Sequence, residues 1–194
     1  MNARSPDRWE KISETKTSST RIFDLVGAVY RHPRRKIEKE FSLIRSRDWV
    51  NVIALTPDGQ IVLVNQFRFG TDAFSLEIPG GIVDPHESAL HAGLRELREE
   101  TGFVGTTTQL LGVVHPNPAF QTNRCHFILV ENAVQTADLA WDEDEEIEVR
   151  TAPVEDVLAL ARSGQITHSL VLAAFFFFED YWRKMNSPKA RQAV

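Results

Sequence analysis

A cluster of acidic side chains in the middle of the chain is the first feature that could do chemistry. Glu96, Glu99 and Glu100 fall within five residues, directly after Arg95. At roughly 100° per residue, a helix places the three glutamates within an arc of about 100°. Carboxylates spaced three and four residues apart repel one another, and one arginine offsets only part of that repulsion. A hard divalent cation would offset the rest, and an all-oxygen ligand set favours Mg²⁺ or Mn²⁺ over zinc.

The residues around these glutamates predict the helix that carries them. The pattern indicates a helix over residues 87–101, ended by Gly102 in a left-handed conformation. Leu90, Leu94 and Leu97 share the face opposite the glutamates, which we expect to be the core side. Small residues on the glutamate side, Ala89 and Gly93 among them, would let the backbone of the preceding Pro-Gly-Gly segment approach closely.

The spacing of the other fixed residues decides between a metal site and an ordinary solvated helix face. Gly81, Glu87 and the segment 95–103 reproduce the pattern G-x5-E-x7-R-E-U-x-E-E-x-G-U, where U is a bulky apolar residue. All seven fixed positions would arise by chance in a chain of this length less than about once in a million. The pattern is the Nudix box, and the chain resembles the Nudix hydrolases.

The resemblance implies a fold and a metal site. Members of the family have an α/β/α sandwich around a mixed β-sheet, here with an N-terminal β extension, and they cleave a diphosphate linked to another moiety using Mg²⁺ or Mn²⁺. Carried over by position, Glu96 and Glu100 are the principal metal ligands, with Glu99 as a third. The main-chain carbonyl of Gly80 matches the backbone ligand that the family places before the box.

The resemblance also implies catalytic helpers around the metal. Arg95 would hold the glutamates in position, and Glu87 would brace the loop. The base that takes a proton from water is expected on a downstream loop, where the acidic run 142–146 makes Glu145 the first choice and Glu143 the second. A solvated acidic loop without a catalytic role remains the alternative.

Two segments point to the branch of the family that cleaves ADP-ribose and other nucleoside diphosphate sugars. Arg68 in "NQFRFG" and Glu77 in "SLEIP" match its paired strands, although an ordinary ion pair would look the same. Pro118 lies 15 residues after Phe103, as in ADP-ribose pyrophosphatases, but the next residue is Ala119 where those enzymes often have glycine.

An aromatic residue is expected to stack on the nucleobase. Trp49 or Phe41 could do this, and a place in the protein core is the alternative for both.

The chain divides into three regions. Residues 1–20 are polar and expected to be mobile, residues 21–48 form an N-terminal β extension, and residues 49–194 form the Nudix domain with its box at 81–103. In this branch the extension exchanges between subunits, so we expect a homodimer. The apolar final helix over residues 167–184, started by Thr167 or Ser169, is predicted to be deeply buried or part of a subunit contact.

Composition limits the other possibilities. The 194 residues are 42% hydrophobic with a net charge of -5, which suits one globular domain and gives no basic field for nucleic acid. Cys125 is the only cysteine, so no internal disulfide can form. The longest apolar run, residues 170–178, is shorter than the ~20 residues of a membrane span. We therefore expect a soluble cytoplasmic protein with a small-molecule substrate.

These observations predict Mg²⁺-dependent hydrolysis of a nucleoside diphosphate sugar, of the ADP-ribose, ADP-sugar or GDP-mannose type, to a nucleoside monophosphate and a sugar phosphate. The alternatives are a different Nudix substrate (a dinucleoside polyphosphate, a nucleoside triphosphate or capped RNA) and a module that senses a nucleotide without cleaving it.

Overall fold

The chain folds into two compact units. The computed structural model describes residues 5–141 and 146–186. The smaller unit comprises Met1–Arg47 and His115–Arg124, and the larger comprises Asp48–Val114 and Cys125–Val194. The glutamate helix and the two glycines before it belong to the larger unit, so that unit carries the candidate site.

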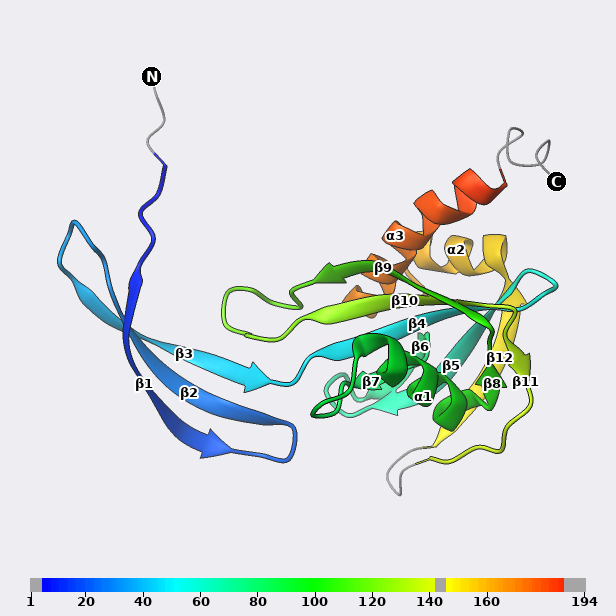
Figure 1. The fold of residues 1–194 in the computed structure, drawn as a ribbon, viewed down its shortest axis with the longest axis horizontal. Coiled ribbons are helices and arrows are strands. Elements are labelled where there is room, and N and C mark those ends of the chain that lie inside the picture. Colours follow the sequence, from blue (N-terminus) through cyan, green and yellow to red (C-terminus); the bar gives the residue numbers. More distant parts are fainter. Residues whose placement is uncertain (1–4, 142–145, 187–194) are drawn as a thin grey trace. The chain divides into compact units, whose positions relative to one another are not determined.

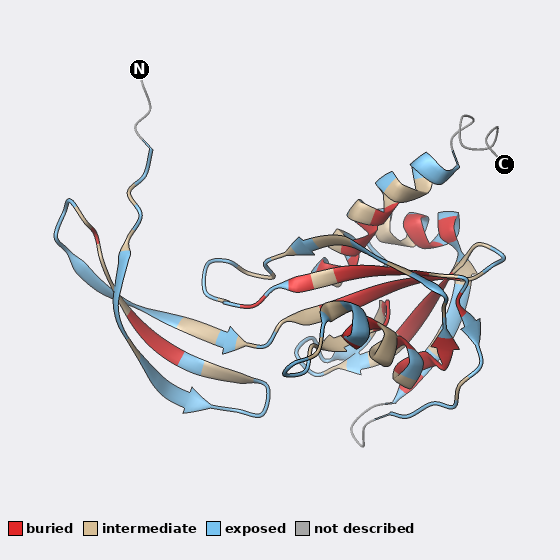
Figure 2. Ribbon diagram, viewed as in Figure 1, coloured by how far each residue is buried: buried red, intermediate tan, exposed pale blue. Residues whose placement is uncertain are grey.

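A mixed sheet forms the centre of the larger unit. Its strands run in the order β12-β5-β4-β10-β9, with β6 paired to β5 and β7 paired to β4. The β4 and β10 strands are parallel, and the other pairs are antiparallel. The strands are β4 (Trp49–Leu55), β5 (Gln60–Arg68), β6 (Ala73–Glu77), β7 (Gly80–Ile82), β9 (Thr107–Val114), β10 (Cys125–Glu131) and β12 (Ile147–Pro153). Figure 2 shows that β4 and β10 are buried along most of their length, and β5 is buried at residues 61–64.

Helices cover both faces of this sheet (Figure 1). Helix α1 (Ala89–Thr101) packs on one face, over a core that includes Val50, Val52 and Ile128. Helices α2 (Val154–Arg162) and α3 (Ser169–Met185) share a second core with the opposite face. A separate two-stranded sheet joins β8 (Phe103–Val104) to β11 (Val134–Gln135). The predicted α/β/α sandwich around a mixed sheet is confirmed.

Local sequence explains where the elements of the site begin and end. The predicted hairpin of β4 and β5 turns through Gly59, whose φ of 78° suits a residue without a side chain. Helix α1 begins after Ser88, whose hydroxyl accepts a hydrogen bond from the His91 N–H at 3.2 Å. It ends at Gly102, whose φ is 71°.

Two details of the helices differ from the prediction. Leu90 is 37% exposed, because the buried face of α1 runs through Leu97 and Glu100 rather than through all three leucines. Gly93 packs against Val50, Val52 and Ile128 of the sheet instead of against the Pro-Gly-Gly segment.

Helix α3 begins after His168, and neither Thr167 nor Ser169 caps it with a side chain. Its predicted burial holds for one face only, since Phe178 is fully buried while Phe176 is 75% exposed. In the ranges that the structure covers, no helix is long and apolar enough to cross a membrane.

The smaller unit is a three-stranded antiparallel sheet. The predicted strands are present as β2 (Phe23–Arg31) and β3 (Glu38–Ser46). A further strand, β1 (Glu10–Ser19), pairs with β2, whereas the sequence analysis expected a mobile segment there. The mostly polar side chains of β1 are largely exposed, and its backbone pairs with β2 along most of its length. The Ile44 N–H donates to the Phe120 carbonyl at 2.8 Å and ties segment 115–124 to β3.

Candidate active site

Two consecutive glycines bring the main chain of β7 against the glutamate helix. A Cβ on Gly81 would overlap the Glu96 carboxylate, so a side chain at this position would displace the carboxylate from where it lies on the strand. The neighbouring Gly80 N–H donates to Glu100 Oε2 at 3.0 Å. Glu100 is only 4% exposed, and this charged side chain is therefore held inside the protein between α1 and β7.

Arg95 connects the acidic side chains of the box to one another. Its Nε and Nη2 donate to the two carboxylate oxygens of Glu87 at 3.1 and 3.0 Å. Its Nη1 donates to Glu96 Oε1 at 2.8 Å and to Glu99 Oε2 at 3.1 Å. Nη2 also reaches the Ile82 carbonyl at 3.0 Å, which fixes the guanidinium against β7. One arginine thus holds three carboxylates and the strand in a single network.

The network also sets the ionisation of its members. The hydrogen bonds from Arg95 lower the pKa of Glu87 below its usual value. In turn, the bonds to Glu87 raise the pKa of Arg95, with smaller contributions from Glu96 and Glu99. Glu87 therefore stays ionised and Arg95 stays protonated, as a brace for the loop requires.

The donor chemistry of the site fits a hard divalent cation. Glu96, Glu99, Glu100 and the Gly80 carbonyl supply only oxygen atoms, which suits Mg²⁺ or Mn²⁺. Across residues 5–141 and 146–186, however, no three acidic, histidine or cysteine side chains are assembled closely enough to hold a metal ion. In this structure Arg95 donates to Glu96 and Glu99, and the Gly80 amide donates to Glu100. The roles of these residues as metal ligands remain predictions.

An ion pair between a partly exposed arginine and a buried glutamate lies on β5 and β6. Arg68 Nε and Nη2 donate to the two oxygens of Glu77 at 2.8 and 2.7 Å. Burial raises the pKa of Glu77, but the hydrogen bonds and charge of Arg68 more than reverse this and lower it below its usual value. Glu77 lies opposite Val64, and Val64 lies opposite Val149, which packs against the core beneath α1. The strand register therefore places the pair on the sheet face that carries the glutamate helix.

The other predicted site residues include two aromatic side chains that the structure describes. Trp49 is half-buried and packs against the core beneath α2 and α3, which favours the core interpretation for its ring. Phe41 belongs to the smaller unit, where it is 43% exposed and contacts Trp9 and Tyr30. Glu143 and Glu145 lie outside the described residues.

Sequence reasoning missed two features close to the box. His126 Nε2 lies 3.0 Å from Asp48 Oδ2, and the Asp48 carbonyl accepts from the Val83 N–H, but 78 residues separate the pair and no local pattern predicts it. The Trp141 indole N–H donates to the Glu100 carbonyl at 2.9 Å. The only signal for Trp141 is a tryptophan directly before the acidic run.

Comparison with known proteins places this geometry in a family. The model of the NUDIX domain matches residues 45–175, which include the two glycines, the glutamate helix and the Arg68–Glu77 pair. The chain therefore belongs to the Nudix family.

Individual members of the family are similar to this chain over much of its length. An ADP-ribose pyrophosphatase of Bacillus subtilis (strain 168) is 30% identical over 156 residues, which cover 80% of this chain and 84% of that protein. A GDP-mannose pyrophosphatase of Yersinia enterocolitica is 32% identical over 57% of this chain and 61% of its own length. The crystal structure of an ADP compounds hydrolase matches with a TM-score of 0.84 and 18% identity, covering 95% of this chain and 99% of that one, and this shows the fold.

Proposed function

We propose that this protein hydrolyses the diphosphate bond of a nucleoside diphosphate sugar to a nucleoside monophosphate and a sugar phosphate, with Mg²⁺ or Mn²⁺ as its cofactor. The observation that carries the proposal is the contact of β7 with α1, where Gly81 accommodates the Glu96 carboxylate and Gly80 binds Glu100. The printed activities of the B. subtilis and Y. enterocolitica proteins support the substrate class.

In this proposal some residues of the box bind the cation and one arginine positions them. Glu96, Glu100, Glu99 and the Gly80 carbonyl would hold the cation, which would neutralise the diphosphate oxygens and polarise phosphorus. Arg95 keeps Glu96 and Glu99 in position through the hydrogen bonds described above.

Hydrolysis also needs a proton acceptor. The oxygen of water attacks one phosphorus, the bridging phosphorus–oxygen bond breaks, and the proton of water passes to a carboxylate. Glu145 is our first choice for that carboxylate and Glu143 our second.

Arg68 is the residue that we assign to the diphosphate outside the box. Its side chain is 42% exposed although its partner Glu77 is almost completely buried, so the ion pair leaves part of the Arg68 side chain accessible to solvent. A fixed, partly exposed arginine on the α1 face can bind phosphate oxygens without losing its ion pair. Glu77 orients it and could accept hydrogen bonds from sugar hydroxyls.

The proposal includes a cytoplasmic homodimer in which the N-terminal β extension, residues 21–48, contributes to assembly and to the base pocket. Several large apolar side chains of the smaller unit are exposed in the single chain, which supports a partner surface there: Ile12, Ile22, Leu25, Ile37 and Phe41. Trp49 stays a candidate for stacking on the base only if its ring leaves the core contact described above.

The first test is product analysis with the wild-type protein. ADP-ribose, an ADP-sugar, GDP-mannose, a dinucleoside polyphosphate, a nucleoside triphosphate and a capped RNA are incubated with Mg²⁺, and the products are identified by mass. We expect AMP and ribose 5-phosphate, or the matching products of another diphosphate sugar. Pyrophosphate from a triphosphate as the preferred product would overturn the substrate class, and tight binding without any product would indicate a sensor.

The second test removes one carboxylate charge. Because a glutamine oxygen can still accept the Gly80 N–H, we expect Glu100→Gln to keep its unfolding temperature but lose more than about 100-fold in turnover. Glu155→Gln, on the exposed side of α2, is the matched control and should keep wild-type turnover. Near-parental hydrolysis by the Glu100 variant would show that the metal assignment is wrong.

A further inference from the structure

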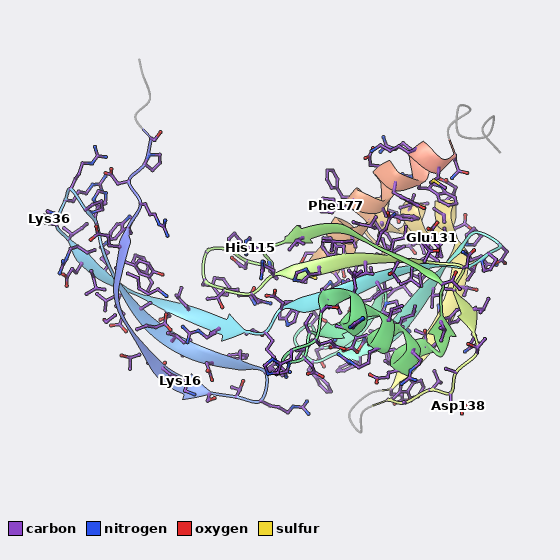
Figure 3. All side chains as sticks on the ribbon, viewed as in Figure 1. Lys16, Lys36, His115, Glu131, Asp138 and Phe177 are labelled. Atoms are coloured by element: carbon purple, nitrogen blue, oxygen red, sulfur yellow. The ribbon has the colours of Figure 1, made fainter. Side chains whose placement is uncertain are left out.

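The carbonyl end of helix α1 is enclosed by a segment that follows it by more than thirty residues. We call residues 135–141 the collar. The collar begins in β11, which follows β10 in sequence and pairs with β8. It includes Asp138, which is labelled in Figure 3. The last four carbonyl groups of any helix lack partners within the helix. In α1 the Arg98 carbonyl accepts from the Gly102 N–H at 2.9 Å, and the other three are left for the collar.

The collar supplies a donor to each of those three carbonyls. The Ala140 N–H donates to the Glu99 carbonyl at 3.0 Å. The Trp141 indole N–H donates to the Glu100 carbonyl at 2.9 Å, and Gln135 Nε2 donates to the Thr101 carbonyl at 3.1 Å. The main-chain N–H groups of residues 136 and 137 both donate to the Gly102 carbonyl at 3.0 Å. The collar therefore satisfies the whole end of the helix.

The carboxyl end of α1 is the end at which N–H donors have a favourable electrostatic effect. A helix carries a partial negative charge at its carboxyl end, and Glu99 and Glu100 add two carboxylates to the same turn. N–H donors directed at these carbonyls offset the partial charge and fix the last turn in position. The two residues whose carbonyls receive Ala140 and Trp141 are the two box glutamates nearest the helix end.

We propose that Trp141 is a positioning residue for the metal site: its indole N–H fixes the main chain of Glu100, and thereby the Glu100 carboxylate, against Gly80. This inference rests on the proposed function, because it assumes that Glu100 binds the cation. Trp141 is 37% exposed, and its one polar side-chain atom donates to the helix.

The test compares two tryptophans that each donate one hydrogen bond. Trp141→Phe removes the donor at Glu100, whereas Trp182→Phe removes an equivalent donor whose acceptor is Glu155 Oε1 at 2.9 Å, on the α2 and α3 side of the sheet. Mn²⁺ binding to the substrate-free protein is measured by electron paramagnetic resonance, together with kcat, KM and the unfolding temperature. We expect the Trp141 variant to bind Mn²⁺ about tenfold more weakly and to lose kcat by a similar factor. The Trp182 variant should keep wild-type Mn²⁺ affinity and kcat.

The possible outcomes distinguish a failure of the positioning role of Trp141 from a failure of the proposed hydrolase function. If Trp141→Phe binds Mn²⁺ and turns over like Trp182→Phe, the positioning role is wrong while the hydrolase proposal stands. If the wild-type protein itself binds no Mn²⁺ and cleaves no diphosphate, the proposed function fails first. Should Trp141→Phe not fold, benzothienylalanine at position 141 keeps the ring size and replaces the N–H by sulfur. We then expect the benzothienylalanine protein to show the same tenfold loss of Mn²⁺ affinity, and unchanged Mn²⁺ binding would overturn the inference.

Discussion

Glu77 shows how a single buried carboxylate keeps its charge. Its side chain is 3% exposed, which by itself favours the neutral acid, yet the two hydrogen bonds from Arg68 hold the ionised form. Glu148 makes a similar pair with Arg150 on β12, but there both side chains are more than half exposed. The two pairs have almost the same geometry and differ in solvation, so they form a natural comparison.

Replacing Arg68 should therefore destabilise the protein, whereas replacing Arg150 should not. Arg68→Met leaves Glu77 buried without its partner, and we expect a loss of about 2–4 kcal/mol in the free energy of unfolding at pH 7, less than for a fully buried pair because Arg68 is partly exposed. Arg150→Met should match the wild-type protein, because exposed pairs contribute little. Urea denaturation of both variants measures the difference, and equal stabilities would contradict the account of the buried pair.

The effect of Arg68→Met should also depend on pH. The folded-state pKa of Glu77 lies below its usual value of 4.5, so the pair contributes stability above about pH 4.5 and loses it as the pH falls through the folded pKa. In the variant, burial without a partner raises the pKa of Glu77 instead, which destabilises the ionised form at neutral pH. The gap between wild type and variant is thus largest near pH 7 and narrows toward pH 3. A gap independent of pH would show that Glu77 ionisation is not its cause.

At the scale of elements, the sequence predicted the features that depend on neighbouring residues, such as turns and helix ends. The turn residues gave the β4–β5 hairpin, and the glycine at 102 gave the end of α1. The prediction of a leucine face on α1 holds for Leu94 and Leu97, which pack in the core, but Leu90 is 37% exposed and Glu100 is buried. A buried carboxyl side chain that accepts a hydrogen bond from a backbone N–H has no signature in hydrophobic periodicity. For the same reason the partners of Glu99 and Glu100 in the collar could not be predicted from the box.

Gly102 has two separate reasons to be glycine, and a substitution can separate them. Its φ of 71° disfavours any side chain, and a Cβ would also lie 2.5 Å from the Ala137 carbonyl of the collar. Gly164, just after α2, has a φ of 78° with nothing within 4 Å of the added Cβ. We expect Gly164→Ala to lose about 1–2 kcal/mol from backbone strain alone.

Gly102→Ala should lose at least about 1 kcal/mol more than Gly164→Ala, because it also displaces the collar. Thermal unfolding of the two variants measures this difference. Mn²⁺ affinity should fall in Gly102→Ala only, since α2 lies away from the box. If both variants lose the same stability and both keep their Mn²⁺ affinity, the collar does not press on the helix end.

At the scale of the whole molecule, the sequence predicted the sandwich and a boundary at residue 48, but it did not predict that a second segment belongs to the smaller unit. Segment 115–124 separates β9 from β10 in sequence, yet it belongs with the N-terminal strands because the Ile44 and Thr122 amides exchange hydrogen bonds with Phe120 and Ile44 carbonyls. Long-range backbone pairing of this kind follows from tertiary structure and leaves no local pattern. The expected boundary at residue 48 accounts for only one of the two segments that make up the smaller unit.

The proposed homodimer gives this smaller unit a testable role. Phe41 and Ser42 are exposed neighbours on β3, and alternation along the strand points their side chains to opposite faces. If the aromatic face formed by Phe41, Tyr30 and Trp9 contacts a second subunit, Phe41→Lys should weaken dimerisation by about tenfold or more, since aromatic side chains dominate such interfaces. Sedimentation equilibrium over a range of concentrations measures the mass against 22.0 kDa for one chain.

Ser42→Lys adds the same charge on the other face and should dimerise like the wild-type protein. A wild-type mass that stays at one chain while hydrolysis proceeds at full rate would rule out the dimer, and equal weakening by both lysines would assign the loss to charge rather than to the aromatic face.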